Sequence, residues 1–150
     1  GQEYARIVEY PRNDLEQDLA QIAVGYASEP NYRAATYLLN LFEKESMVDI
    51  MKDIRTHLNE VNHLVSKDRE LNTLGYVFLH SDRTQEALLT FQFNTIIHPH
   101  SPRAFNSFGE AKFLNGDKSG AILAFKRVIE LDPKHENANL RLKELEAEGK

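Results

Sequence analysis

A 34-residue period in the second half of the chain is the feature that most restricts its fold. Four kinds of landmark residue recur at this single offset: Gly75 and Gly109, Ala87 and Ala121, Phe91 and Phe125, and Pro99 and Pro133. A fixed period of about 20–50 residues is typical of repeat proteins, in which each unit packs on the next. The period therefore predicts two copies of one structural unit, over residues 68–101 and 102–135.

Apolar residues within each copy have the spacing of an α-helix. In the first copy, one helix side carries residues at positions i, i+3, i+4 and i+7, which are Leu71, Leu74, Gly75 and Phe78. The second copy begins the same pattern with Phe105, Phe108 and Gly109. Glycine inside a helix costs about 1 kcal/mol relative to alanine. Its recurrence predicts that a neighbouring helix packs too closely there for a side chain, and we interpret Ala87 and Ala121 in the same way.

Helix starts and stops are marked at the expected places. Ser101-Pro102 offers an N-cap followed by proline in the first turn, and Asn115-Gly116-Asp117 offers a left-handed stop and then a new cap. Asp132-Pro133 closes the next helix. Each copy is therefore expected to be a helical hairpin.

The two copies resemble the tetratricopeptide (TPR) repeat family. The first copy reads Leu71-x2-Leu74-Gly75-x2-Phe78, Ala87-x3-Phe91 and Pro99, and the second reads Phe105-x2-Phe108-Gly109-x2-Lys112, Ala121-x3-Phe125 and Pro133. Two positions depart from the family, because Lys112 replaces an aromatic residue and Asn94 a small apolar one. The resemblance covers residues 68–148 and implies an all-α, right-handed superhelix of hairpins, closed by a capping helix at residues 136–148.

The first half of the chain shows helical patterns without a clear repeat. Helices are expected at residues 13–27, 32–42 and 47–65, with a polar break at 43–46 and a weak strand-like run at 5–10. A 34-residue shift places Leu41 and Asp53 where the glycine and alanine landmarks should stand. We therefore interpret residues 1–65 as an N-terminal helical extension, at best a degenerate hairpin, that forms one structural unit with residues 66–150.

Composition excludes several classes of function. The residues are 41% hydrophobic, and no apolar run approaches the roughly 18 residues of a membrane span, so membrane insertion is not expected. The formal net charge of -5 disfavours nucleic acid as a partner, because binding it requires a basic surface. The absence of cysteine excludes disulfides and thiolate metal sites but leaves the cellular compartment open.

No residue pattern typical of catalysis is present. The chain contains no Gly-x-Ser-x-Gly nucleophile motif and no glycine-rich phosphate loop. Its one histidine cluster, His98-Pro99-His100, falls at an expected helix end, where histidines are commonly solvated. We predict no enzymatic activity, no cofactor and no metal.

The TPR resemblance implies a concave groove lined by the first helix of each hairpin, where ligands bind. The residues expected on that face are Arg69, Asn72, Tyr76, Leu79, Arg103, Asn106, Glu110 and Phe113. Amides can bind a peptide backbone, aromatic rings supply apolar contact, and arginine can hold a carboxylate in a bidentate manner. The alternative is that these residues have no ligand-binding role. The asparagines would then be merely tolerated on exposed helices, and Tyr76 and Phe113 would pack on the N-terminal extension.

Two functions follow from this pattern. The favoured one is a non-catalytic module that binds a protein or peptide. The alternative is an accessory domain with an intramolecular partner domain in a longer chain, because Leu71-Asn72-Thr73-Leu74-Gly75-Tyr76, Phe93-Asn94 and Phe108-Gly109-Glu110-Ala111 resemble the two-repeat tails of bacterial serine hydrolases. Chaperone-type recognition of terminal carboxylates is not supported, because the first helices lack the lysines that it uses.

Overall fold

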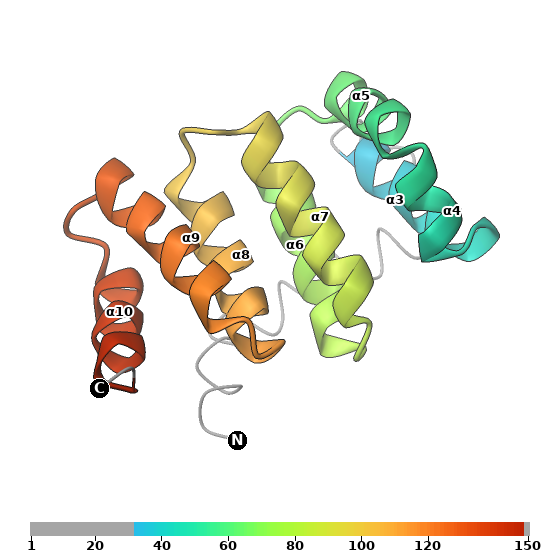
Figure 1. The fold of residues 1–150 in the computed structure, drawn as a ribbon. Coiled ribbons are helices and arrows are strands. Elements are labelled where there is room, and N and C mark those ends of the chain that lie inside the picture. The colour runs from blue at the N-terminus through green and yellow to red at the C-terminus, as the bar shows by residue number, and fades with distance from the viewer. Residues whose placement is uncertain (1–31, 149–150) are drawn as a thin grey trace.

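The computed structural model describes residues 32–148, and within that range it contains eight α-helices and no strand (Figure 1). The helices are α3 (Arg33–Lys44), α4 (Met47–Lys52), α5 (Ile54–Leu64), α6 (Asp68–His80), α7 (Thr84–Ile97), α8 (Pro102–Leu114), α9 (Lys118–Leu131) and α10 (Glu136–Glu148). The predicted all-α class is confirmed.

Helix boundaries in the second half follow the 34-residue period. The three first helices α6, α8 and α10 begin at Asp68, Pro102 and Glu136, and the second helices α7 and α9 begin at Thr84 and Lys118. Helices α6 and α7 pack together as one pair, α8 and α9 as the next, and α10 packs on α9. The pairs stand side by side in a row that runs from α3–α5 to α10 (Figure 1).

Close helix contacts explain the repeated glycines. A Cβ atom on Gly75 would lie 2.2 Å from Cε1 of Phe91, and one on Gly109 would lie 2.8 Å from Cε1 of Phe125. Both phenylalanines belong to the second helix of the same hairpin, and both are fully buried. The prediction that a neighbouring helix leaves no room for a side chain is confirmed.

The predicted turns are also present. Gly116 has a φ of 81°, and Asp82, its counterpart 34 residues earlier, has a φ of 58°. The Ser101 hydroxyl accepts the Ala104 N–H at 3.1 Å, and the Asp117 carboxylate accepts the Gly120 N–H at 2.9 Å. These capping bonds satisfy amide groups at the starts of α8 and α9 that would otherwise lack a partner.

The first half differs from its prediction in one respect. The single helix expected over residues 47–65 is wrong, because the chain leaves the helical conformation at Asp53 and divides into α4 and α5. The Asp53 N–H donates to the Ile50 carbonyl, a tight turn that ends α4, and the new direction lets α5 pack on both α3 and α7. The features expected at residues 5–10 and 13–27 lie outside the described residues.

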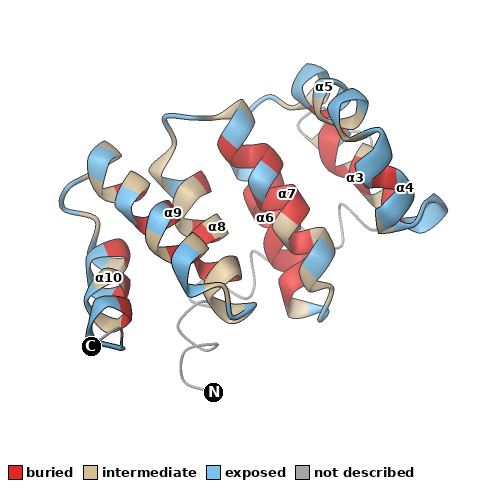
Figure 2. Ribbon diagram, in the orientation of Figure 1, coloured by how far each residue is buried: buried red, intermediate tan, exposed pale blue. Residues whose placement is uncertain are grey.

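Two apolar clusters form the core. The larger joins α3, α5, α6 and α7 and includes an edge-to-face contact between Phe42 and Phe78, whose ring centroids are 5.2 Å apart. The smaller joins α9 and α10 around Phe125 and Leu145. Helix α6 is buried along residues 70–79, whereas α10 exposes the side that faces away from the row (Figure 2).

Candidate functional site

The eight residues predicted to line a groove fall into two groups. Four are buried, with exposed fractions of 5% for Asn72, 6% for Tyr76, 5% for Leu79 and 2% for Glu110. Arg69 and Arg103 are exposed, and Asn106 and Phe113 are half-buried. Asn72, which was expected on the groove face, is therefore part of the core, and only part of the expected surface is open to solvent.

The recurring asparagines connect successive units. The Ser107 hydroxyl donates to Oδ1 of Asn72, which joins α8 to α6. One repeat later, Nδ2 of Asn137 donates to Oδ1 of Asn106 at 2.9 Å, which joins α10 to α8. A buried amide needs such a partner, so at least part of the recurrence that suggested ligand binding has a structural cause.

A buried ion pair fixes α10 to α8. Nε of Arg141 lies 2.9 Å from Oε1 of Glu110, and the same oxygen accepts a bond from Nδ2 of Asn137 at 2.6 Å. The guanidinium also lies 4.8 Å from the ring centre of Phe113 and contacts the Glu144 carboxylate at 3.0 Å. Burial acts to lower the pKa of Arg141, but the bonds and charges of the two glutamates outweigh burial and raise that pKa.

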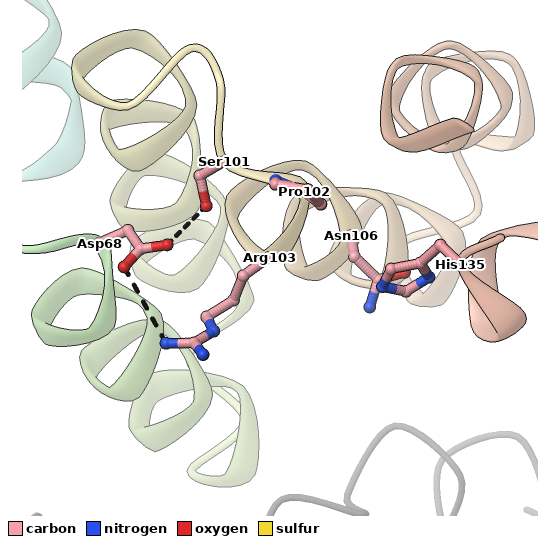
Figure 3. A pocket seen from close by; sticks show the side chains of 6 residues that line it. All are labelled: Asp68, Ser101, Pro102, Arg103, Asn106 and His135. Atoms are coloured by element: carbon pink, nitrogen blue, oxygen red, sulfur yellow. Dashed lines mark hydrogen bonds and ion pairs between the residues drawn. The ribbon is translucent and has the colours of Figure 1, made fainter. Parts of the chain in front are cut away.

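An open hollow lies where the starts of three first helices meet. Its volume is about 500 Å³, and its walls are Asp68, Ser101, Pro102, Arg103, Asn106 and His135 (Figure 3). The Ser101 hydroxyl donates to Oδ2 of Asp68 at 2.5 Å. Two of the predicted groove residues, Arg103 and Asn106, are thus brought together at one open site.

Arg103 is the most available charged group of this hollow. Its side chain is 55% exposed, and Nη1 lies 3.9 Å from Oδ1 of Asp68, too far for a hydrogen bond. His135 faces the hollow beside Asn106 (Figure 3) and accepts the Ala138 N–H through Nδ1, which caps α10. A second hollow of about 370 Å³ shares Asp68 and Ser101 and extends along His98, Pro99 and His100.

No protein-family model matches this chain, and a search of curated proteins finds no match.

The two departures from the TPR pattern have local explanations. Asn94 is fully buried and donates through Nδ2 to the Asp68 carbonyl at 2.9 Å, which fixes the start of α6. Lys112 lies 4.8 Å from the ring centre of Phe108 and pairs with Asp117 at 3.0 Å.

Chemistry-bearing side chains also meet between α3 and α5. The Tyr37 hydroxyl forms a 2.7 Å hydrogen bond with Nδ1 of His57, and Nε2 of that histidine lies 3.7 Å from Glu45. Burial, and then the nearby carboxylates of Glu60 and Glu45, raise the pKa of Tyr37. A raised pKa makes the phenolate form of Tyr37 scarce at neutral pH.

Asp68, Ser101 and His135 were not predicted as site residues, although the sequence held a signal for them. Helix starts that recur every 34 residues must lie along one edge of a regular stack. Residues just before and within the first turns of α6, α8 and α10 therefore come together.

Among residues 32–148 no group of three or more potential metal ligands forms, and no helix in that range is long and apolar enough to span a bilayer.

Proposed function

We propose that this chain is a non-catalytic, TPR-like interaction module that holds a peptide or a segment of a partner protein. The supporting observation is the hollow of about 500 Å³ whose walls come from three successive units, with Arg103 and Asn106 at its surface. A site that spans several repeats suits an extended ligand, because each unit contributes contacts at a regular spacing.

The side chains at the hollow favour a ligand that carries a carboxylate. The Arg103 guanidinium forms an ion pair with Asp68 at 3.9 Å but no hydrogen bond, so a ligand carboxylate can occupy its donors in a bidentate manner. Pro102 offers apolar area beside it, and the Asn106 amide can contact a peptide backbone. The proposed ligand is therefore an extended peptide with an acidic side chain.

The test is binding to an array of ten-residue peptides that differ in charge, followed by calorimetry of those that bind. We expect Arg103→Ala to weaken binding of acidic peptides by about 1.5–3 kcal/mol, the usual net value of a hydrogen bond to a charged group. The loss should shrink as salt is raised, because salt screens an exposed charge pair.

Lys126→Ala is the matched control. Lys126 is an exposed cation on α9 and is not part of the hollow, so its removal changes net charge equally without touching the site. Equal weakening by both variants would point to general charge attraction. Unchanged affinity in Arg103→Ala, or no peptide bound by the wild-type chain, would refute the proposal.

A further inference from the structure

A buried carboxyl group lies at the junction between the N-terminal helices and the repeats. Glu70, in the first turn of α6, is 3% exposed. Its Oε2 accepts the N–H groups of Ala34 and Ala35 at 3.1 and 3.3 Å. Both hydrogen bonds cross from α3 to α6 over a sequence separation of 36 and 35 residues.

Helix α3 depends on this distant carboxyl for its cap. The residue at its N-cap, Tyr32, makes no side-chain capping bond, and the first turn contains no acidic residue. The first amides of a helix need acceptors and favour negative charge. Glu70 therefore performs, from another helix, the task that a local serine or aspartate usually performs.

The same carboxyl group is poorly placed to hold a charge. Its second oxygen, Oε1, is buried and has no hydrogen-bond partner. Burial raises the pKa of Glu70 to about 7, against the smaller lowering effect of the two amide bonds. The neutral form keeps both bonds, because Oε2 still accepts as a carbonyl oxygen while Oε1 carries the proton.

Among residues 32–148, no cation forms a salt bridge with the Glu70 carboxyl. Glu70 lines a hollow of about 250 Å³, and the other residues of its walls are Tyr32, Ser66, Lys67 and Arg69. The causes of the shift in the pKa of Glu70 are burial and the two amide bonds, and neither Lys67 nor Arg69 is among them. On α7 and α8, the charged groups have partners elsewhere: Glu86 with Arg83, Arg103 with Asp68, Glu110 with Arg141 and Lys112 with Asp117.

We propose that Glu70 is a proton-controlled latch, which holds α3 against α6 while its carboxyl is neutral and loosens this contact when it ionises. The docked state binds a proton more tightly than the undocked one. Docking is therefore strongest below the ordinary pKa of 4.5 and weakens as pH rises to about 7, above which it changes no further. The latch acts on the N-terminal junction and does not depend on the proposed peptide site.

The experiment is amide hydrogen exchange of the full chain between pH 5 and 8, corrected for the intrinsic effect of pH. Each unit of pKa difference changes the docking equilibrium about tenfold. We expect protection of the Ala34 and Ala35 amides to fall by about tenfold or more relative to the Phe125 amide of α9. In Glu70→Gln, which cannot ionise, the fall should be less than about twofold.

Glu136→Gln is the matched control, because Glu136 is an exposed glutamate in the first turn of α10. It should retain the full pH response. The proposal is overturned if Glu70→Gln retains that response, or if the wild-type chain shows none. Should Glu70→Gln fail to fold, carbon-13 titration of the Glu70 carboxyl in the wild-type chain decides: a midpoint near 7 supports the latch, and one near 4.5 excludes it.

Discussion

At Gly75 and Gly109, helix propensity and side-chain packing favour different residues. A helix would favour alanine at both, but each lies against a phenylalanine ring of its own hairpin. Periodicity predicted a closely packed neighbouring helix at these positions, and the structure shows that the contacting groups are the two rings. Asn72 shows the opposite outcome. Its burial depends on the Ser107 hydroxyl 35 positions away, and no local pattern indicates that pairing.

Replacing Gly75 with alanine should destabilise the chain. The new methyl would lie 2.2 Å from the Phe91 ring, which is fully buried and has little room to move. Overpacking of this kind costs about 1–3 kcal/mol, which exceeds the gain of about 1 kcal/mol from better helix propensity. Gly109→Ala, with 2.8 Å to Phe125, should cost less. Urea denaturation measures both, and a more stable Gly75→Ala would show that the hairpin is loosely packed.

At the scale of elements, the sequence predicted where the repeat helices begin and end better than it predicted which residues of each helix are buried. In the helix at residues 136–148, Ala138, Leu142 and Leu145 are apolar residues at helical spacing, and all three belong to the smaller core cluster. The structure buries Ala138, Arg141 and Leu145, which also have helical spacing. Arg141 was overlooked because a charged residue is usually solvated, and its acceptor Glu110 lies 31 residues away.

The Glu110–Arg141 pair should be strongly coupled in stability. Arg141→Met leaves the Glu110 carboxylate buried without its cation, which costs about 3–5 kcal/mol. Removing both charges in Glu110→Leu/Arg141→Met should recover much of that loss, since apolar residues of similar size often replace buried ion pairs without penalty. Chemical denaturation of the four proteins in this double-mutant cycle gives the coupling energy. Simple additivity of the two single losses would mean that the pair does not hold α10.

Across the whole molecule, the all-α class and the 34-residue spacing of the repeat helices could be predicted because they depend on local signals repeated in each unit. The break at Asp53 and the Glu70 junction could not. The Glu70 junction joins parts of the chain that are far apart in sequence, through the bonds from Ala34 and Ala35 to Glu70, and the helical spacing of residues 47–65 continues through the break. The hollow could be predicted only in part. The repeat places the helix starts along one edge, but it does not determine which side chains remain exposed there.

The purified chain should show no esterase, peptidase or phosphatase turnover above background. Residue types that can form a catalytic set meet at Tyr37, His57 and Glu45. The pKa of Tyr37 is raised, so its hydroxyl stays protonated at neutral pH, and the sequence holds no Gly-x-Ser-x-Gly nucleophile motif. Standard chromogenic esters and phosphates measure this, with Tyr37→Phe as the comparison. Saturable turnover that survives repurification and disappears in Tyr37→Phe would instead make this cluster an active site.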